Sequence, residues 1–172
     1  MEYPEYKQDF DTHFAQPLRG IGLEAAESPE GQMLMIGPFG AVIASMDNYE
    51  FQTMIRVPNI DRPVLVWDLA RYLLPDEGIV WGGFKTHLDL SERENVIKMM
   101  QTQARWIAGV IKPVMQGDTS LLEGYQNYIE KRAHYYKILD TQLPKEHPLR
   151  NAFTEPDYLE QAEKYFRENG IK

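Results

Sequence analysis

The sequence predicts an α+β fold in which a small antiparallel sheet from the N-terminal half packs against long C-terminal helices. Residues 32–57 are rich in β-favouring side chains that alternate with a period of two, whereas apolar residues after position 91 recur at helical spacing. Strands that gather early and helices that gather late favour segregated layers over alternating β–α–β units. The chain of 172 residues has no internal repeat or linker-like stretch, and it is within the usual size of one domain. We therefore expect residues 1–172 to form a single domain.

The segment 1–31 lacks a clear period and contains three prolines and three glycines. Tyr6, Phe10 and Phe14 are spaced four residues apart, which places them on one face of a helix. We expect helical turns around these aromatic residues and irregular structure from there to Gly31. The segment as a whole is predicted to be an irregular, acidic start to the domain.

Three runs, QMLMI, AVIAS and EFQTMIRV, predict three consecutive strands of a meander between residues 32 and 57. The sequence Gly-Pro-Phe-Gly at 37–40 joins the first two runs. A phosphate-binding loop needs converging backbone N–H groups at the start of a helix. Pro38 has no N–H group, and the residues after Gly40 favour a strand. We therefore predict a hairpin turn at 37–40 rather than a ligand cradle.

Residues 61–78 are predicted to form a helix that connects the sheet to the C-terminal half. Asp61 is suited to cap its start and Pro63 to occupy its first turn, and a proline and a glycine follow its last apolar residues. The short apolar run at 78–84 is a candidate for one more strand.

Three further helices are predicted in the C-terminal half. Ser91, followed three residues later by Glu94, forms a capping box. An apolar stripe then continues for about six turns, and Pro113 is expected to kink or stop that helix. A second long helix is predicted over 117–140. An amphipathic helix is predicted over 154–170, with a threonine near its start and a glycine at its end.

Acidic residues are concentrated at the N-terminal end of the chain. Residues 1–50 contain nine acidic and two basic residues, so −7 of the formal net charge of −8 lies there, whereas the rest of the chain contains 17 acidic and 16 basic residues. Nucleic-acid binding depends on lysine and arginine, so this distribution argues against a nucleic-acid partner. It suits a basic protein partner. The alternative is that the charge only keeps a solvated segment soluble.

Our first functional hypothesis is a non-enzymatic, acidic protein-binding module. A stoichiometric inhibitor, such as an immunity-type protein that protects a cell from a cationic toxin or nuclease, is one form of it. The residues predicted to bind the basic partner belong to this acidic stretch of the first fifty positions: Glu24, Glu27, Glu30, Asp47 and Glu50. Under this hypothesis no catalytic residue, metal or cofactor is expected.

The second hypothesis is a small metal-dependent hydrolase that uses His87 and Asp89. Residues two apart on a strand point to the same face, so this pair is able to bind a metal or share a proton. Metal sites usually need at least three ligands, and Asp89 also has a structural alternative, since it lies close to a predicted helix N-terminus. A third hypothesis is a structural or assembly subunit.

The location expected from the sequence is cytoplasmic, without a membrane partner. No apolar run approaches the roughly 18 residues needed to cross a bilayer, and the first residues are acidic where a secretory signal is basic and then apolar. The chain has no cysteine, which excludes disulfides and thiolate nucleophiles. The sequence makes no prediction of the oligomeric state.

Overall fold

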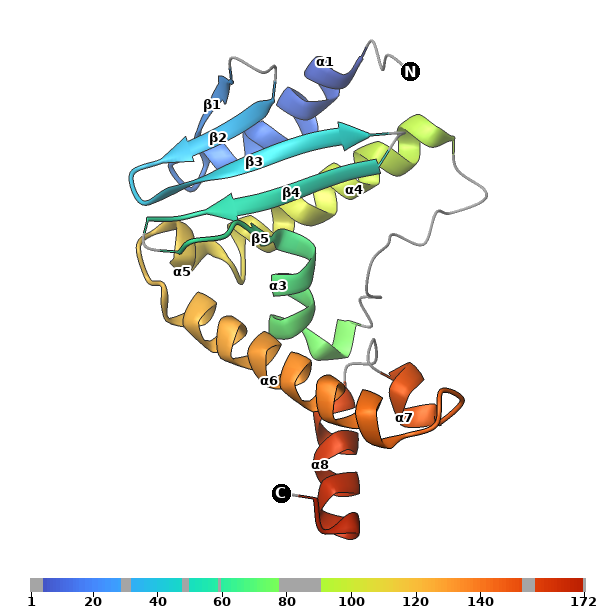
Figure 1. The fold of residues 1–172 in the computed structure, drawn as a ribbon. Coiled ribbons are helices and arrows are strands. Elements are labelled where there is room, and N and C mark those ends of the chain that lie inside the picture. The colour runs from blue at the N-terminus through green and yellow to red at the C-terminus, as the bar shows by residue number, and fades with distance from the viewer. Residues whose placement is uncertain are drawn as a thin grey trace.

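The α+β prediction is confirmed by a five-stranded antiparallel sheet in the N-terminal half, followed by long helices (Figure 1). The computed structural model describes residues 5–28, 32–47, 50–58, 60–77, 91–152 and 157–171. The strands pair in chain order as a meander: β1 (Glu24–Glu27), β2 (Met33–Gly37), β3 (Gly40–Asp47), β4 (Glu50–Arg56) and β5 (Val64–Leu65). The longer helices are α3 (Val66–Leu73), α4 (Glu92–Ala108), α6 (Ser120–Gln142) and α8 (Tyr158–Asn169). The shorter ones are α1 (Tyr6–Phe10), the π-helix η1 (Asp11–Ala15), α2 (Gln16–Arg19), the 3-10 helix η2 (Pro75–Glu77), α5 (Lys112–Met115) and α7 (Pro148–Asn151).

The hairpin turn predicted at 37–40 is confirmed, because Gly37 and Gly40 pair across its base. A Cβ atom on Gly40 would lie 2.7 Å from the carbonyl oxygen of Arg56, so the backbones approach too closely for a larger residue. The ring of Phe39 at the tip lies against Gly117, where an added Cβ would lie 3.0 Å from Cδ1 of that ring. The turn thus contacts the loop before α6 and helps to position that helix.

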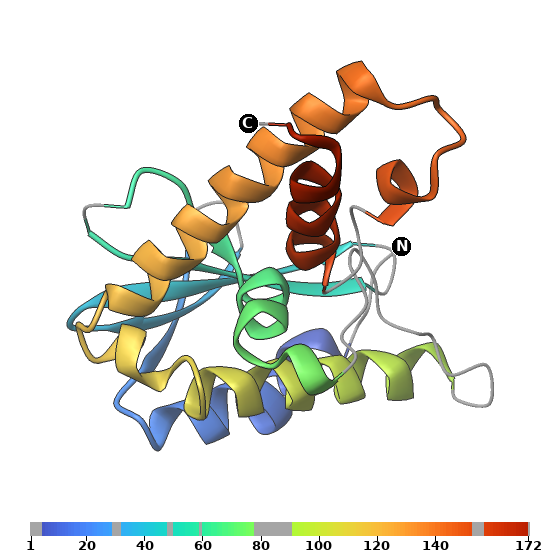
Figure 2. The same ribbon diagram turned by 90° about the horizontal axis from the view of Figure 1, so that it is seen from below.

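The two faces of the sheet have different surroundings. Figure 2 shows α1, η1, α2 and α4 on one side of the sheet, where Met35, Val42 and Ile55 are buried. We call this the inner face. The opposite, outer face carries an apolar row that crosses all five strands through directly paired residues: Ala26, Leu34, Ile43, Met54 and Leu65. This row is partly exposed, with Leu65 37% exposed.

The N-terminal segment is more regular than the sequence predicts. The expected helical turns are present, and Phe10 and Phe14 are fully buried. The prediction of irregular structure up to Gly31 is wrong for residues 16–19, which form α2, and for residues 24–27, which form β1. Glu-Ala-Ala-Glu has little intrinsic β preference, but pairing with β2 supplies the hydrogen bonds of a strand.

The predicted helix start at Asp61 is also wrong. Val64 pairs with Ile55 and Leu65 pairs with Met54, so these two residues form β5, and α3 begins only at Val66. Pairing with the edge of β4 outweighs the local helix signal. A proline just before a strand is compatible with this arrangement, because a strand end tolerates the missing N–H group.

The capping box at the start of α4 is confirmed. The Ser91 hydroxyl accepts a hydrogen bond from the Glu94 N–H group at 3.3 Å, and the Glu94 carboxylate accepts one from the Ser91 N–H group at 2.8 Å. The helix ends at Ala108, before Pro113, because Gly109 breaks it and α5 then continues the apolar stripe.

The second long helix is confirmed as α6, and the last one as α8, which ends at Gly170 in the left-handed conformation (φ 65°). Helix α8 begins at Tyr158, and Thr154, its predicted start, lies outside the described residues, as does the candidate strand at 78–84. The one-turn helix α7 has no counterpart among the predicted elements.

Buried apolar residues form two clusters along α6. The larger one, which we call the sheet cluster, fills the space between the inner face and the helices and includes Phe10, Phe14, Met35, Phe51, Ile107 and Leu122. The smaller one, the helical cluster, consists of Leu139, Leu143, Leu149, Tyr158 and Ala162. Figure 1 shows α6 running from the sheet to α7 and α8. That residues 1–172 form one domain stays a prediction.

Candidate functional site

The structure separates the predicted partner-binding residues into two groups. Glu24 and Glu27 begin and end β1, and both are exposed. Asp47 ends β3 and pairs with Glu50 at the start of β4, with β2 between them and β1. Glu30 lies outside the described residues. The four predicted residues that the structure describes, Glu24, Glu27, Asp47 and Glu50, therefore do not form one compact cluster.

Glu24 and Glu27 point to opposite faces of the sheet. Directly paired residues share a face, and Glu24 pairs with Ile36 of the outer face, whereas Glu27 pairs with Met33, which packs against the sheet cluster. Because side chains alternate along a strand, the two carboxylates lie on the two sides of the edge strand β1. Only Glu27 faces the helices.

Three acidic residues of the first third form ion pairs with basic residues of the same chain. Glu27 pairs with Lys7 at 2.9 Å and Asp11 with Arg19 at 2.5 Å, and both pairs are exposed. Asp9, whose side chain is only 5% exposed, accepts two hydrogen bonds from the Arg93 guanidinium of α4. Glu5, Glu24 and Glu50 make no ion pair with a described residue. The negative field is therefore weaker than the formal charges suggest.

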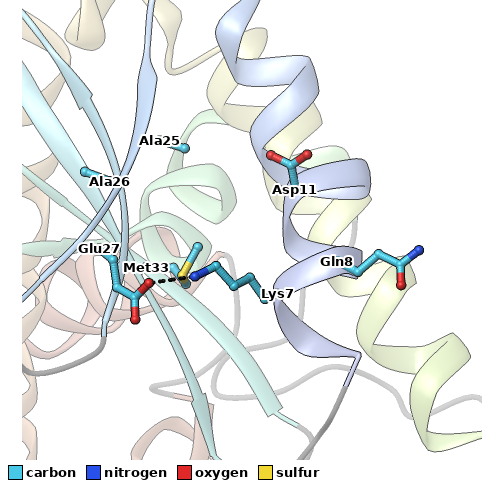
Figure 3. Close-up of a pocket in the computed structure, with 7 residues that line it drawn as sticks. All are labelled: Lys7, Gln8, Asp11, Ala25, Ala26, Glu27 and Met33. Atoms are coloured by element: carbon cyan, nitrogen blue, oxygen red, sulfur yellow. Dashed lines mark hydrogen bonds and ion pairs between the residues drawn. The ribbon is translucent and has the colours of Figure 1, made fainter.

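A surface pocket of about 660 Å³ lies between the first helices and β1 (Figure 3). Its lining residues are Lys7, Gln8, Asp11, Ala25, Ala26, Glu27 and Met33. The side chain of Lys7 extends across the pocket toward Glu27, and the small side chain of Ala25 points from β1 toward the first helices. This volume is within the range of pockets that bind ligands. We call this pocket the β1 groove.

The backbone of β1 offers hydrogen-bonding groups to the β1 groove. The Ser28 N–H group donates to the Gln32 carbonyl at 2.8 Å, so this pair is of the hydrogen-bonded kind. Hydrogen-bonded and non-hydrogen-bonded pairs alternate along an antiparallel ladder. Ala26 therefore bonds to β2, whereas the N–H and carbonyl groups of Ala25 and Glu27 point away from it. No other described strand pairs with this edge of β1.

A second cluster of polar residues is buried where α3, α6 and α8 meet. Arg132 is only 1% exposed; it donates a hydrogen bond to the Tyr128 hydroxyl and lies over the rings of Tyr128 and Tyr158 at 5.2 and 5.3 Å. Burial raises the pKa of Asp68, an effect that nearby Arg71 and Arg132 oppose. Arg132 of α6 thus contacts Tyr158 of α8 and lies near Asp68 of α3, so this cluster links the three helices.

The hydrolase hypothesis receives no test from the described residues. His87 and Asp89 lie outside them. Of the other histidines, His13 contacts Gln101 on α4, and His147 accepts a hydrogen bond from the Leu149 N–H group at the start of α7. Within the described part of the chain, no group of three or more potential ligands is placed to hold a metal ion.

No protein-family model, curated protein or solved structure matches this chain. In the described part of the chain, the β1 groove lies beside an edge of β1 with which no other described strand pairs, and carboxylates line it. Charge counting identified Glu27, but it missed Lys7, Asp11 and the alanines of β1. No local signal in the sequence places Lys7 beside a residue twenty positions later.

Of the described helices, none is long and apolar enough to span a bilayer.

Proposed function

We propose that this chain is a non-enzymatic module that binds a basic protein partner through the β1 groove and the acidic residues around it. The observation that carries the proposal is the position of the pocket, which opens between the carboxylates of Asp11 and Glu27, while the exposed Glu24 lies on the other face of the same edge strand. A stoichiometric inhibitor of a cationic toxin or nuclease, acting in the cytoplasm, is the form of partner binding that we favour.

The internal ion pairs are compatible with this role because they are weak. Exposed salt bridges stabilise a protein by about 0 to 1 kcal/mol, so a partner's cations can replace Lys7 and Arg19 at little cost. Glu24, which makes no ion pair with a described residue, and the overall charge of −8 then favour approach of a positively charged surface. We expect the complex to be strongly salt-sensitive.

The test compares three proteins in a capture experiment from native lysate: the natural chain, the variant E24K/E27K, and the control E160K/E168K, which reverses two exposed charges on α8. We expect the natural chain and the control to retain the same basic protein at about 50 mM salt, with loss at about 300 mM salt. The groove variant should lose it.

The captured protein is then purified and titrated against all three chains. Equal affinity for the groove variant and the natural chain, or an affinity indifferent to salt, would contradict the proposal. Inhibition of an activity of the captured protein at a molar ratio of one would support the inhibitor form.

The hypothesis of an assembly subunit is favoured by a different surface, the outer face. Its exposed apolar row lies beside a second row of paired residues, Glu24, Ile36, Ala41 and Arg56, with opposite charges at its ends. A two-fold axis along the strands would place Glu24 of one copy against Arg56 of another.

Sedimentation equilibrium tests this alternative. The variant R56E should weaken self-association, and the double variant E24R/R56E should restore it. A natural chain that stays monomeric at about 100 μM would exclude the alternative.

A further inference from the structure

We infer that the partner binds as an extended segment that adds to β1 as a sixth strand, and that one of its lysine or arginine side chains takes the place of Lys7 beside Glu27. The inference rests on the proposed function and specifies its binding mode. Addition of a strand to a free sheet edge derives affinity from backbone hydrogen bonds and specificity from alternate side chains.

The edge of β1 has the backbone groups that such a strand needs. The N–H and carbonyl groups of Ala25 and Glu27 point away from β2, because hydrogen-bonded pairs alternate along the ladder and Ser28 and Gln32 form one of them. The β1 groove lies along this edge, and the small side chain of Ala25, which points toward the helices, leaves it open.

Lys7 shows where the partner's cation would lie. Its Nζ atom is 2.9 Å from Oε2 of Glu27, and the hydrogen bond raises the pKa of the lysine. Proteins often protect an edge strand with a lysine, but β1 contains none, and the lysine comes from α1 instead. The two side chains are 75% and 51% exposed, so an incoming cation meets little resistance from this pair.

The register of β1 specifies the spacing of basic residues in the partner. A partner residue that pairs directly with Glu27 points to the same face of the sheet as Glu27, and a partner residue that pairs directly with Glu24 points to the same face as Glu24. Glu24 and Glu27 are three positions apart on opposite faces. The partner segment therefore carries two basic residues separated by two others, in either strand direction.

The experiment uses the full chain and two synthetic peptides of identical composition. Thr-Val-Lys-Val-Thr-Lys-Val-Thr has the inferred spacing, and Thr-Val-Lys-Lys-Val-Thr-Val-Thr does not. We expect calorimetric titration to show tighter binding of the first peptide. We also expect K7Q to bind it about two- to fivefold more tightly, since the internal competitor is removed. Equal binding of the two peptides would overturn the inferred spacing, and an unchanged or weaker affinity of K7Q would overturn the role of Lys7.

A matched pair of variants tests the backbone contact. A25P removes an N–H group that points away from β2 and so leaves the β1–β2 ladder intact, whereas A25S keeps it. Loss of one backbone hydrogen bond should weaken binding of the first peptide by about three- to tenfold in A25P, with A25S close to the natural chain. Equal affinity of the two variants would overturn strand addition.

N-methylated peptides provide the same test without altering the protein, should A25P fail to fold. Methylation of one alternate set of peptide N–H groups should abolish binding, and methylation of the other set should leave it unchanged. Loss with both sets, or with neither, overturns strand addition. If E24K/E27K loses the captured protein while these backbone changes have no effect, the proposed function stands and only the binding mode fails.

Discussion

The sheet cluster and the helical cluster differ in how far apart in sequence their members lie. In the sheet cluster, Phe51 of β4 contacts the rings of Phe10 and Phe14, with centroids 6.5 and 5.1 Å apart, and α4 packs beside them. All buried members of the helical cluster come from residues 139–162. Stability is not uniform across a protein, and locally connected segments open first. We therefore infer that the helical cluster opens without the sheet.

Arg132 links the two clusters. It contacts Tyr128, which packs against the sheet cluster, and Tyr158, which belongs to the helical cluster. Burial raises the pKa of Tyr158 to about 12, so this tyrosine stays neutral over the usual pH range. The coupling between the clusters thus passes through a buried guanidinium group between two aromatic rings.

The largest effect is expected from F51A, in the sheet cluster. Removal of a buried phenylalanine destabilises a protein by about 3 to 5 kcal/mol, and here it also removes the ring contacts of β4 with Phe10 and Phe14. Denaturant unfolding followed by circular dichroism measures the change. L65A, on the partly exposed outer face, is the control and should cost less than about 1 kcal/mol. Similar losses for both variants would contradict the assignment of the two faces.

L139A, in the helical cluster, should be less disruptive to the molecule as a whole. We expect a loss of about 2 to 4 kcal/mol for the packing around Leu139, which is fully buried. In native-state hydrogen exchange, amides of α8 should exchange faster, while those of β3 and β4 keep their protection. Equal acceleration in the strands would show that the two clusters unfold together.

Q103L tests a polar contact inside the sheet cluster. Gln103 of α4 donates to the Phe51 carbonyl at 2.8 Å and accepts from the Thr53 hydroxyl at 2.5 Å, and both side chains are buried. A leucine at this position would leave the Phe51 carbonyl and the Thr53 hydroxyl without the Gln103 side chain, which should lower the free energy of unfolding by about 1 to 3 kcal/mol. Adding T53V should recover part of the loss in equilibrium unfolding. A double variant less stable than Q103L would argue against the hydroxyl contact.

The smallest effect is expected from D68N, at the junction of the clusters, and it depends on pH. Burial raises the pKa of Asp68 above its ordinary value of 3.8. At pH values between the ordinary pKa and the raised pKa of the folded state, the folded state binds more protons than the unfolded state. The contribution of Asp68 to stability therefore falls as pH rises through this window. The stability of D68N relative to the natural chain should therefore increase from about pH 3 to about pH 7. Denaturant unfolding curves of both proteins, recorded at several pH values in this range, measure the difference. A constant difference would contradict this.

The parts of the fold that depend on local chemistry were predictable from the sequence. The turn at Gly37 and Gly40 and the cap at Ser91 are specified by residues within a few positions of one another. The strands β1 and β5 were not predicted, because Glu-Ala-Ala-Glu and Val-Leu adopt strand conformation only through pairing with their neighbours. Tertiary pairing outweighs weak local preference.

The candidate site was predictable only in part, for the same reason. A count of charges identifies Glu24 and Glu27 as acidic residues of interest. The β1 groove exists because α1 packs beside a strand that begins about twenty residues later, and its lysine is visible only in the folded chain. The pair of Asp9 and Arg93 spans 84 positions, and no sequence period indicates it.

The bond between Lys7 and Glu27 has a consequence for selectivity. Because both residues belong to one chain, the lysine occupies the carboxylate as a tethered competitor, with an effective concentration on the order of millimolar. Free amines and isolated lysine side chains at micromolar concentration leave it in place. Only a ligand that makes several contacts at once displaces the lysine. The tethered lysine therefore selects ligands by the number of contacts they make and not by charge alone.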